Sequence, residues 1–274
     1  MESFNLDKMP TRLIEGQAQY SLLTSQGQEI ELNQFVGSIL KIHYKKVINC
    51  THCQRETKKS FAGGYCYPCS IKLAECDMCI LKPELCHFAK GTCRQPVWGQ
   101  ENCMIPHYVY LANSSGLKVG ITRTTQIPHR WIDQGAIAAL PIMKVSTRLQ
   151  SGLFEKLFSS EINDKTDWRK MLKGEVIDVD LEEARDQLFN SFGEDIDELE
   201  DKIGTGQIEL LESEKIIQIK YPVIEYPQKV SSLSLEKTDV VGGVLKGIKG
   251  QYLIFDTGVI NIRSHTGYKV ELEF

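Results

Sequence analysis

The sequence predicts an α+β protein that contains a zinc-binding cysteine module. Three observations lead to this prediction. All nine cysteines fall within 54 of the 274 residues, strand-like segments bounded by turn residues occur at both ends of the chain, and a strand–turn–strand pattern followed by helical segments lies between them. About 42% of the residues are apolar, which is enough for one sizeable core or for two to three small ones.

The order of these patterns divides the chain into five segments. They are an N-terminal β segment (1–48), a zinc-binding cysteine module (49–104), a small α/β domain (105–173), an acidic helical segment (174–214) and a C-terminal small β domain (215–274). Neither set of terminal strands is large, so one sheet shared between them is an arrangement to expect. The sequence alone reveals no internal repeat.

The N-terminal segment alternates apolar and polar residues between turn signals. The alternation is clearest over 19–23, 28–32 and 39–44. Because successive side chains of a strand point to opposite faces, this pattern predicts three or four short antiparallel strands.

The first four cysteines form two CxxC pairs separated by twelve residues: Cys50, Cys53, Cys66 and Cys69. Each CxxC turn aims two thiolates at one point, and two turns complete a tetrahedral four-sulfur site. Gly63 and Gly64 allow the chain to fold back between the pairs. A reducing cytosol disfavours disulfides, so the spacing predicts structural zinc. A closed four-sulfur site has no open coordination position, and this metal should fold the module without performing chemistry.

A second set of potential ligands follows directly, and its membership is ambiguous. The first choice is Cys76, Cys79, Cys86 and Cys93. His87 or Cys103 could replace one of these, and the pairs could also interleave between two metals. The sequence therefore predicts one or two zinc ions. An iron–sulfur cluster is the chemical rival, because four thiolates also suit iron.

The central segment predicts a hairpin and two helices. Residues 107–112 and 117–122 have the pattern of strands, and Asn113-Ser114-Ser115-Gly116 has the composition of a turn. Pro128 is placed near the start of a helix that carries Arg130 and Trp131. A further helix runs through 151–158.

Charge is segregated along the chain. Residues 175–201 hold twelve acids and one base, whereas residues 105–173 hold ten bases and five acids. The stretch from Asp180 to Asp201 predicts one helix with an apolar stripe at Leu181, Ala184, Leu188, Phe189 and Phe192. A basic body beside an acidic segment is compatible with a polyanionic partner such as nucleic acid, and equally with a solvated acidic helix.

The C-terminal segment again has strand signals with glycines at hairpin spacing. The candidate strands are 216–221, 243–250, 252–255, 259–262 and 268–274, with a turn at Asp256-Thr257-Gly258. This spacing predicts a small antiparallel sheet or barrel.

The order of motifs over 107–173 resembles the GIY-YIG nuclease superfamily. In that superfamily a hairpin carries the two name motifs, an arginine follows on the next helix, and a glutamate on a later helix holds a metal. Tyr108-Val109-Tyr110 stands at the place of the first motif, and Lys118-Val119-Gly120 at the place of the second. The resemblance implies a GIY-YIG-like α/β fold for this part of the chain.

The same resemblance assigns site residues. Arg130 falls ten residues after Gly120 and matches the arginine, and Glu155 matches the glutamate. On this basis Glu155 would hold Mg²⁺ or Mn²⁺, Arg130 would bind the scissile phosphate, and Tyr110 would position water. Tyr108 and Lys118 complete the candidate catalytic set.

Several residues depart from the superfamily pattern or compete with it. Lys118 replaces the second tyrosine, and Gln134 stands where a histidine or tyrosine is often found. Glu161 is a competing carboxylate on the same predicted helix. Four further residues follow that helix, and a polar loop with a core tryptophan is the expected arrangement: Asn163, Asp164, Asp167 and Trp168.

Nearly the whole chain also resembles an uncharacterised bacterial family, catalogued only as a domain of unknown function. The stretches that carry this second resemblance are 76–80 and 130–136. It implies no activity.

Three functions are compatible with these patterns. The first is an endonuclease that depends on a divalent cation, and the second is a non-catalytic nucleic-acid-binding protein. The third is an interaction scaffold that uses its acidic segment. The chain has no apolar run of about 18 residues, so no membrane span is expected. It has no apolar stretch after its start, so no signal peptide is expected either. We therefore expect a cytoplasmic location.

Overall fold

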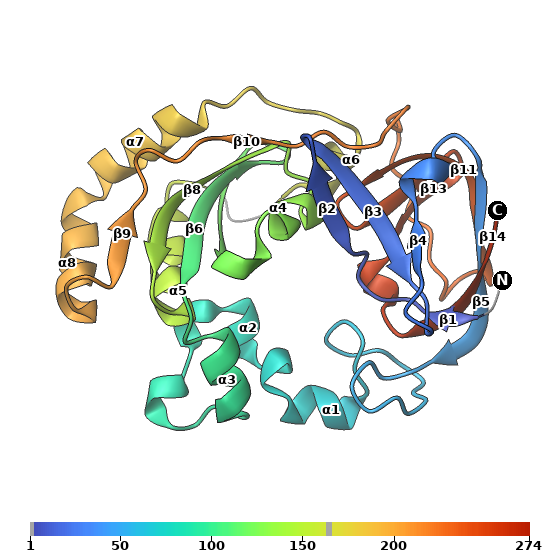
Figure 1. Cartoon of the computed structure of the whole chain (residues 1–274), viewed down its shortest axis with the longest axis horizontal. Coiled ribbons are helices and arrows are strands. Elements are labelled where there is room, and N and C mark those ends of the chain that lie inside the picture. The colour runs from blue at the N-terminus through green and yellow to red at the C-terminus, as the bar shows by residue number, and fades with distance from the viewer. Residues whose placement is uncertain (1–2, 163–165) are drawn as a thin grey trace.

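The structure, a computed structural model, describes residues 3–162 and 166–274. It combines antiparallel sheets with short helices in three parts that surround a central gap (Figure 1). The parts are a β lobe made of both ends of the chain, a central sheet with its helices, and the cysteine module that runs between them.

The β lobe contains a six-stranded antiparallel sheet to which both ends of the chain contribute. Its order is β1 (Phe4–Asn5), β14 (Tyr268–Glu273), β5 (Ile39–Ile48), β11 (Val240–Lys249), β12 (Tyr252–Phe255) and β13 (Gly258–Asn261). A three-stranded sheet completes the lobe with β2 (Thr11–Ile14), β3 (Gln17–Leu23) and β4 (Glu29–Glu31). The expectation of a sheet shared between the terminal segments is confirmed.

The β lobe also contains a structural repeat that the sequence did not reveal. Each copy is a hairpin, a 3-10 turn, a glycine with positive φ and a long strand. The first copy comprises β3, β4, η1 (Asn33–Phe35), Gly37 and β5, and the second comprises β12, β13, η6 (Arg263–His265), Gly267 and β14. The glycines have φ values of 94° and 90°.

The glycine of each copy donates an equivalent hydrogen bond to the segment that precedes the other copy. The N–H of Gly37 donates to the carbonyl of Leu245 at 2.7 Å, and the N–H of Gly267 donates to the carbonyl of Leu6 at 2.7 Å. At the centre of the β5–β14 ladder, Ile42 lies opposite Leu272. These two residues occupy the same position in their copies, so the copies meet around an approximate two-fold axis.

The central sheet has the order β10 (Ile217–Gln218), β8 (Ala138–Val145), β6 (His107–Asn113) and β7 (Leu117–Arg123), and β9 (Ile208–Leu210) also pairs with β8. The predicted hairpin is confirmed. The predicted strand at 216–221 is shorter and pairs with β8, so it belongs to this sheet and not with the other C-terminal strands.

The two faces of the central sheet bury different partners. Val109 and Leu111 pack with α5 (Arg148–Phe158) and α7 (Leu181–Ser191), whose apolar side chains join the same core cluster. On the other face, Tyr110 and Ala112 belong to a core that continues through α4 (His129–Asp133) into the β lobe. The helix that carries Arg130 is therefore held between the sheet and the β lobe.

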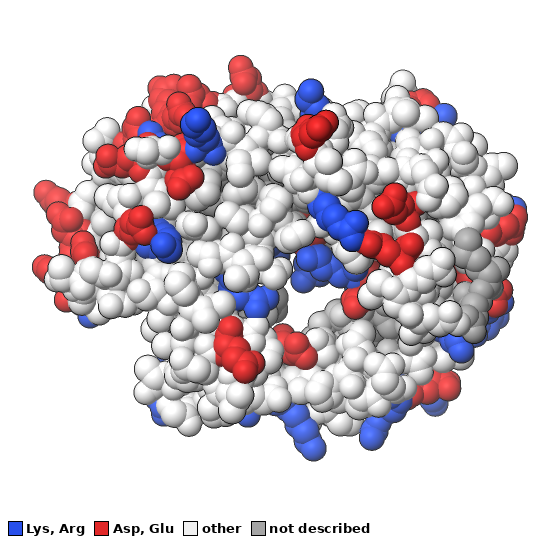
Figure 2. All heavy atoms as spheres, viewed as in Figure 1, with Lys and Arg blue, Asp and Glu red and all other residues white. Residues whose placement is uncertain are grey.

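The acidic segment forms two helices where the sequence predicted one. These are α7 and α8 (Gly193–Ile203), and the break lies at Phe192 and Gly193. Four of the predicted stripe residues are buried against the central sheet: Leu181, Ala184, Leu188 and Phe192. Acidic side chains gather on the outside of these helices, at the left in Figure 2.

The cysteine module leads from the end of β5 to the start of β6 through short helical turns. They are α1 (Tyr67–Lys72), η2 (Ala74–Cys76), α2 (Met78–Leu81), η3 (Pro83–Leu85), η4 (Phe88–Lys90) and α3 (Pro96–Asn102). The remaining elements are η5 (Thr124–Gln126) and α6 (Trp168–Leu172). Within the described ranges, every helix is too short or too polar to cross a lipid bilayer.

Candidate functional site

The first cysteine set converges as the spacing predicted. The four sulfur atoms of Cys50, Cys53, Cys66 and Cys69 all lie within 4.8 Å of one another. Cys50 follows the end of β5 closely, and Cys66 is the residue that precedes α1. The backbone closes each CxxC turn, because the N–H of Gln54 donates to the carbonyl of Cys50 at 2.9 Å and that of Cys69 donates to Cys66 at 3.1 Å.

Gly64 fixes this cluster to the β lobe. Its φ of +135° favours glycine, and a β-carbon there would stand 2.8 Å from Cγ2 of Thr266 and 2.9 Å from Cγ2 of Thr51. The N–H of Thr51 donates to the carbonyl of Gly64 at 2.9 Å, which joins the two knuckles. The cluster therefore sits rigidly at the end of β5, next to η6.

The electrostatics of the four thiols favour a bound cation. Burial acts to raise the pKa of Cys50, but the N–H groups of Cys53, Cys66 and His52 outweigh it and lower that pKa to about 6. Burial and the neighbouring sulfurs raise the pKa of Cys69 to about 12. Without a cation a thiolate is thus favoured at Cys50 and disfavoured at Cys69. Four thiolates need a divalent ion between them, and a four-sulfur donor set fits zinc.

The second cysteine set gathers with a different membership. Cys79, Cys86, Cys93 and Cys103 line one small cavity together with His87. Among the described residues Cys76 is not part of that lining. The sulfur of Cys76 is close enough to Cys50 to interact with it, and burial, Glu75 and Cys50 raise its pKa to about 11. The structure does not bring together the four ligands chosen first from the sequence.

A second constellation surrounds Tyr110. This residue lies opposite Gly120 in the β6–β7 ladder, and a β-carbon on Gly120 would stand 2.6 Å from the Tyr110 hydroxyl oxygen. The ring consequently lies over Gly120, which has no side chain to displace it. The hydroxyl donates to Oε1 of Gln134 at 2.8 Å, and the tyrosine is 0% exposed.

Arg130 and Glu155 both act electrostatically on the Tyr110 hydroxyl. Burial raises the pKa of Tyr110, the nearby guanidinium of Arg130 lowers it, and the carboxylate of Glu155 raises it. Arg130 belongs to α4 and Glu155 to α5, and both are half-buried. Three residues predicted from the sequence thus come from three different elements into one region, called here the Tyr110 site.

Arg148 adjoins the Tyr110 site and was not singled out from the sequence. Burial lowers its pKa, and the charges of Arg130 and Glu155 both act on it. Its Nη2 donates to the carbonyl of Ile80 at 2.7 Å. A single arginine in the first turn of a helix has no distinctive local pattern, so sequence reasoning had no signal for it.

The other candidates lie around this site with different surroundings. Tyr108 is half-buried and lies opposite Thr122. Lys118 is buried, and its Nζ donates to Oγ1 of Thr166 at 3.4 Å. Glu161 lies beyond the end of α5 and is exposed, so it does not compete with Glu155.

The residues after α5 follow the expected pattern only in part, because Trp168 begins helix α6 and is half-buried where a core tryptophan was expected. Asp167 caps α6 through its carboxylate, and Trp168 stacks on Tyr252 with ring centroids 5.7 Å apart. Asn163 and Asp164 lie outside the described residues.

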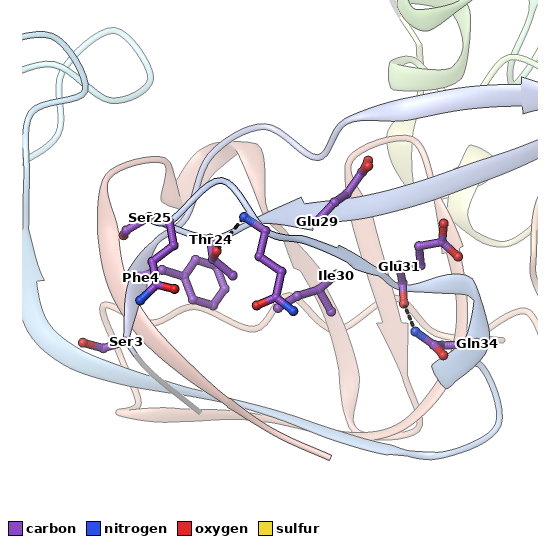
Figure 3. A pocket seen from close by; sticks show the side chains of 10 residues that line it. Ser3, Phe4, Thr24, Ser25, Glu29, Ile30, Glu31 and Gln34 are labelled. Atoms are coloured by element: carbon purple, nitrogen blue, oxygen red, sulfur yellow. Dashed lines mark hydrogen bonds between the residues drawn. The ribbon is translucent and has the colours of Figure 1, made fainter.

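Two concave features differ in charge. Figure 2 shows a hollow bounded by α4 and β2 on one side and by α1 and α2 on the other, with Lys and Arg side chains on its rim below α4 and Asp and Glu side chains on other parts of the rim. The pocket of about 560 Å³ in Figure 3 lies in the β lobe and is lined by uncharged polar residues, Phe4, Ile30, Glu29 and Glu31. The lining of this pocket has no basic residue among those described, whereas the hollow has basic side chains on the part of its rim below α4.

Comparison with known proteins gives one match. A family model described as "Protein of unknown function (DUF2797)" matches residues 37–270. The matched range begins at Gly37 and includes both cysteine sets, the central sheet and nearly all of the second repeat. No curated protein and no solved structure matches the chain.

Proposed function

Because the chain belongs to the DUF2797 family of proteins of unknown function, we propose a function from its sites: a nucleic-acid phosphodiesterase that depends on a divalent cation. One observation carries the proposal. The guanidinium of Arg130 on α4 and the carboxylate of Glu155 on α5 both act electrostatically on the hydroxyl of Tyr110 on β6.

The pairing of Tyr110 with Gly120 supports the likeness to the GIY-YIG hairpin. The two motifs lie on successive strands, and Tyr110 of the first stands opposite Gly120 of the second. A residue larger than glycine at 120 would collide with the tyrosine ring. The glycine therefore has a specific packing role in presenting Tyr110.

The chemistry follows from the groups present. Phosphodiester hydrolysis develops negative charge on the phosphate oxygens, which a guanidinium such as that of Arg130 can clamp. Glu155 would hold Mg²⁺ or Mn²⁺, hard cations that prefer oxygen ligands, and such a cation supplies Lewis-acid stabilisation of the phosphate when bound. The Tyr110 hydroxyl donates its hydrogen bond to Oε1 of Gln134, so its oxygen keeps acceptor lone pairs that can orient a water.

The rest of the protein suits a nucleic-acid substrate. Residues 105–173 carry ten bases and five acids, and Lys and Arg side chains lie on the part of the hollow's rim below α4. Phosphate contacts of this kind supply most of the affinity for nucleic acid. The thiolate cluster at Cys50 holds structural zinc, which fixes the module beneath the hollow and takes no part in the chemistry.

A non-catalytic nucleic-acid-binding protein is the second candidate function. The observation that favours it is the complete burial of Tyr110, together with Lys118 and Gln134 at positions where the superfamily has proton-transfer groups. Such a protein would keep the hairpin and the basic hollow but would not hydrolyse its ligand.

A cleavage assay separates the two. Wild type, Glu155→Ala and Glu161→Ala would be incubated with single- and double-stranded DNA and RNA in Mg²⁺ or Mn²⁺. We expect wild type and Glu161→Ala to cleave equally, and Glu155→Ala to be slower by on the order of 10²–10³-fold, as for loss of other transition-state charge partners. Equal cleavage by Glu155→Ala refutes the site. Salt-dependent binding with no cleavage by any protein establishes the second function.

A further inference from the structure

Four cysteines of the second set come from separate elements to one small cavity. Cys79 lies in α2, Cys86 directly follows η3, Cys93 follows η4, and Cys103 caps the C-terminus of α3. All four line the cavity, which has a volume of about 10 Å³. That is room for about one water-sized sphere.

The thiols in this cavity are close enough to influence one another. Burial raises the pKa of Cys79, and Asp77, Cys86 and Cys103 add to the rise, which reaches about 11. Burial also raises the pKa of Cys103, and Cys86 and Cys93 add to it. Each of the four cysteines is thus within electrostatic range of at least one other. The packing also places Cys93 directly against α3, because a β-carbon on Gly99 of that helix would stand 3.1 Å from the sulfur of Cys93.

We propose that Cys79, Cys86, Cys93 and Cys103 bind a second zinc ion, separate from the first set, and that Cys76 is not a ligand. The proposal is independent of the phosphodiesterase function. The sulfurs of the first set all lie within 4.8 Å of one another, and those of the second set lie farther apart. Binding of an ion therefore draws the four sulfurs of the second set inward. A cavity with room for one sphere suits a single ion and not a multi-iron cluster.

Asp77, Cys79 and His87 each bring one ligand atom within 4.8 Å of the other two, and the proposal assigns the ion to the thiols because four thiolates make a complete tetrahedral donor set. Oδ2 of Asp77 is 2.6 Å from Nε of Arg94, in an ion pair that already neutralises the carboxylate. Nδ1 of His87 is 2.8 Å from Oγ1 of Thr92, and its Nε2 is 3.6 Å from Asp77. This polar network borders the thiols and braces the loop that carries Cys86.

The second ion would also fix α5 in place. The backbone N–H of Arg148 donates to the carbonyl of Cys103 at 2.8 Å, and its side chain donates to the carbonyls of Cys79 at 3.5 Å and Ile80 at 2.7 Å. Further along the helix, Gly152 touches the turn after α2, where a β-carbon would stand 2.5 Å from Cβ of Pro83. The first two turns of α5 thus rest on the elements that supply Cys79 and Cys103.

Metal content and thiol counting test the proposal. Wild type loaded with zinc should contain two ions per chain by elemental analysis. Of its nine cysteines only Cys76 should then react with a thiol reagent in the native state. Cys76→Ser should keep both ions and leave no reactive thiol. Cys103→Ser should contain one ion, and His87→Ala should keep two.

Other outcomes overturn the proposal. One zinc and five reactive thiols in wild type would show that only the first set binds metal. Loss of an ion in Cys76→Ser or in His87→Ala would refute the ligand set, and iron in place of zinc would refute the identity of the ion. If Cys103→Ser does not fold, the thiol count of wild type and Cys76→Ser still decides, because neither measurement uses that variant.

Discussion

Asp133, at the end of α4, forms an ion pair with Lys8, with 2.5 Å between Oδ2 and Nζ. The other carboxylate oxygen accepts a hydrogen bond from Nε2 of Gln251 at 2.8 Å. The Asp133 side chain is only 4% exposed. One buried carboxylate therefore ties the helix that carries Arg130 to both ends of the chain.

Replacing Asp133 with Ala should destabilise the protein by about 2 kcal/mol or more, because a buried partner is removed from Lys8 and Gln251. Urea unfolding measures the effect. Glu198→Ala is the matched control, since its pair with Lys202 is largely exposed to solvent and should contribute little to stability. Equal stability of the two variants would contradict the role given to Asp133.

Gly120→Ala should cost about 1–3 kcal/mol, because the new methyl group would overlap the Tyr110 ring and force it to move. The same variant should weaken any cleavage activity. Gly193→Ala is the control, since no atom lies within 4 Å of a β-carbon at that position, at the start of α8. The denaturant concentration at the midpoint of unfolding is compared for the two variants and wild type. An unchanged midpoint for Gly120→Ala would show that the Tyr110 ring does not lie over the glycine.

Lys249→Met should stabilise the protein at neutral pH. Lys249 is 0% exposed, burial lowers its pKa to about 8, and within the described part of the chain its Nζ has no hydrogen-bond partner. Below pH 8 the ammonium is charged in both folded and unfolded states, and burying it costs up to ~3 kcal/mol.

That cost shrinks as the pH rises from about 8 towards the ordinary lysine value of 10.5, because the folded protein releases its proton first. The gain from Lys249→Met should therefore narrow over this range in unfolding experiments. Two rings face the ammonium, with centroids of Tyr221 and Tyr226 at 5.3 and 5.4 Å. A variant less stable than wild type at pH 7 would mean that these cation–π contacts outweigh the burial.

His107 should make stability fall on mild acidification. Burial lowers its pKa to about 4, and its Nδ1 donates to the carbonyl of Ile105 at 2.7 Å. The unfolded chain takes up a proton near pH 6.5 and the folded protein only near pH 4, so up to ~3 kcal/mol is lost as the pH falls through this window. His107→Gln should lose this part of the pH dependence. Parallel stability curves for variant and wild type would refute the assignment.

Local patterns in the sequence predicted local structure well. The CxxC pairs at Cys50 and Cys66 each set two sulfurs within one turn, so spacing alone placed them. The Tyr110 hairpin was equally local, with its strands joined by a short turn. The break at Gly193 was missed because Leu188, Phe192 and Ile196 continue an apolar stripe through it, and all three are buried.

Features that depend on distant contacts could not be derived in this way. By position in the sequence, Cys76 and Cys103 are equally good candidates for a ligand of the second metal. Only the fold shows that Cys76 lies toward Cys50 while Cys103 lines the second cavity. Residues 217–218 have the pattern of a strand, but nothing in the sequence says that their partner is β8. Arg148 likewise gains its importance from the carbonyls of another segment.

The repeat in the β lobe was hidden because it is preserved in the backbone more than in the side chains. The glycines at 37 and 267 are shared, but the 3-10 turns before them read Asn-Gln-Phe and Arg-Ser-His, and the hairpin loops differ in length. What matches is the pattern of main-chain hydrogen bonds, which any residue can supply.

The exchanged bonds of Gly37 and Gly267 make the β lobe a discontinuous domain, with everything between its two halves inserted into it. Both chain ends lie in this lobe (Figure 1), so a permuted protein that joins them and opens elsewhere would keep the lobe whole. A shortened chain that starts at Gly37, where the family match begins, would lack Leu6. It would leave the N–H of Gly267 without its acceptor and expose the core on which the helix of Arg130 rests.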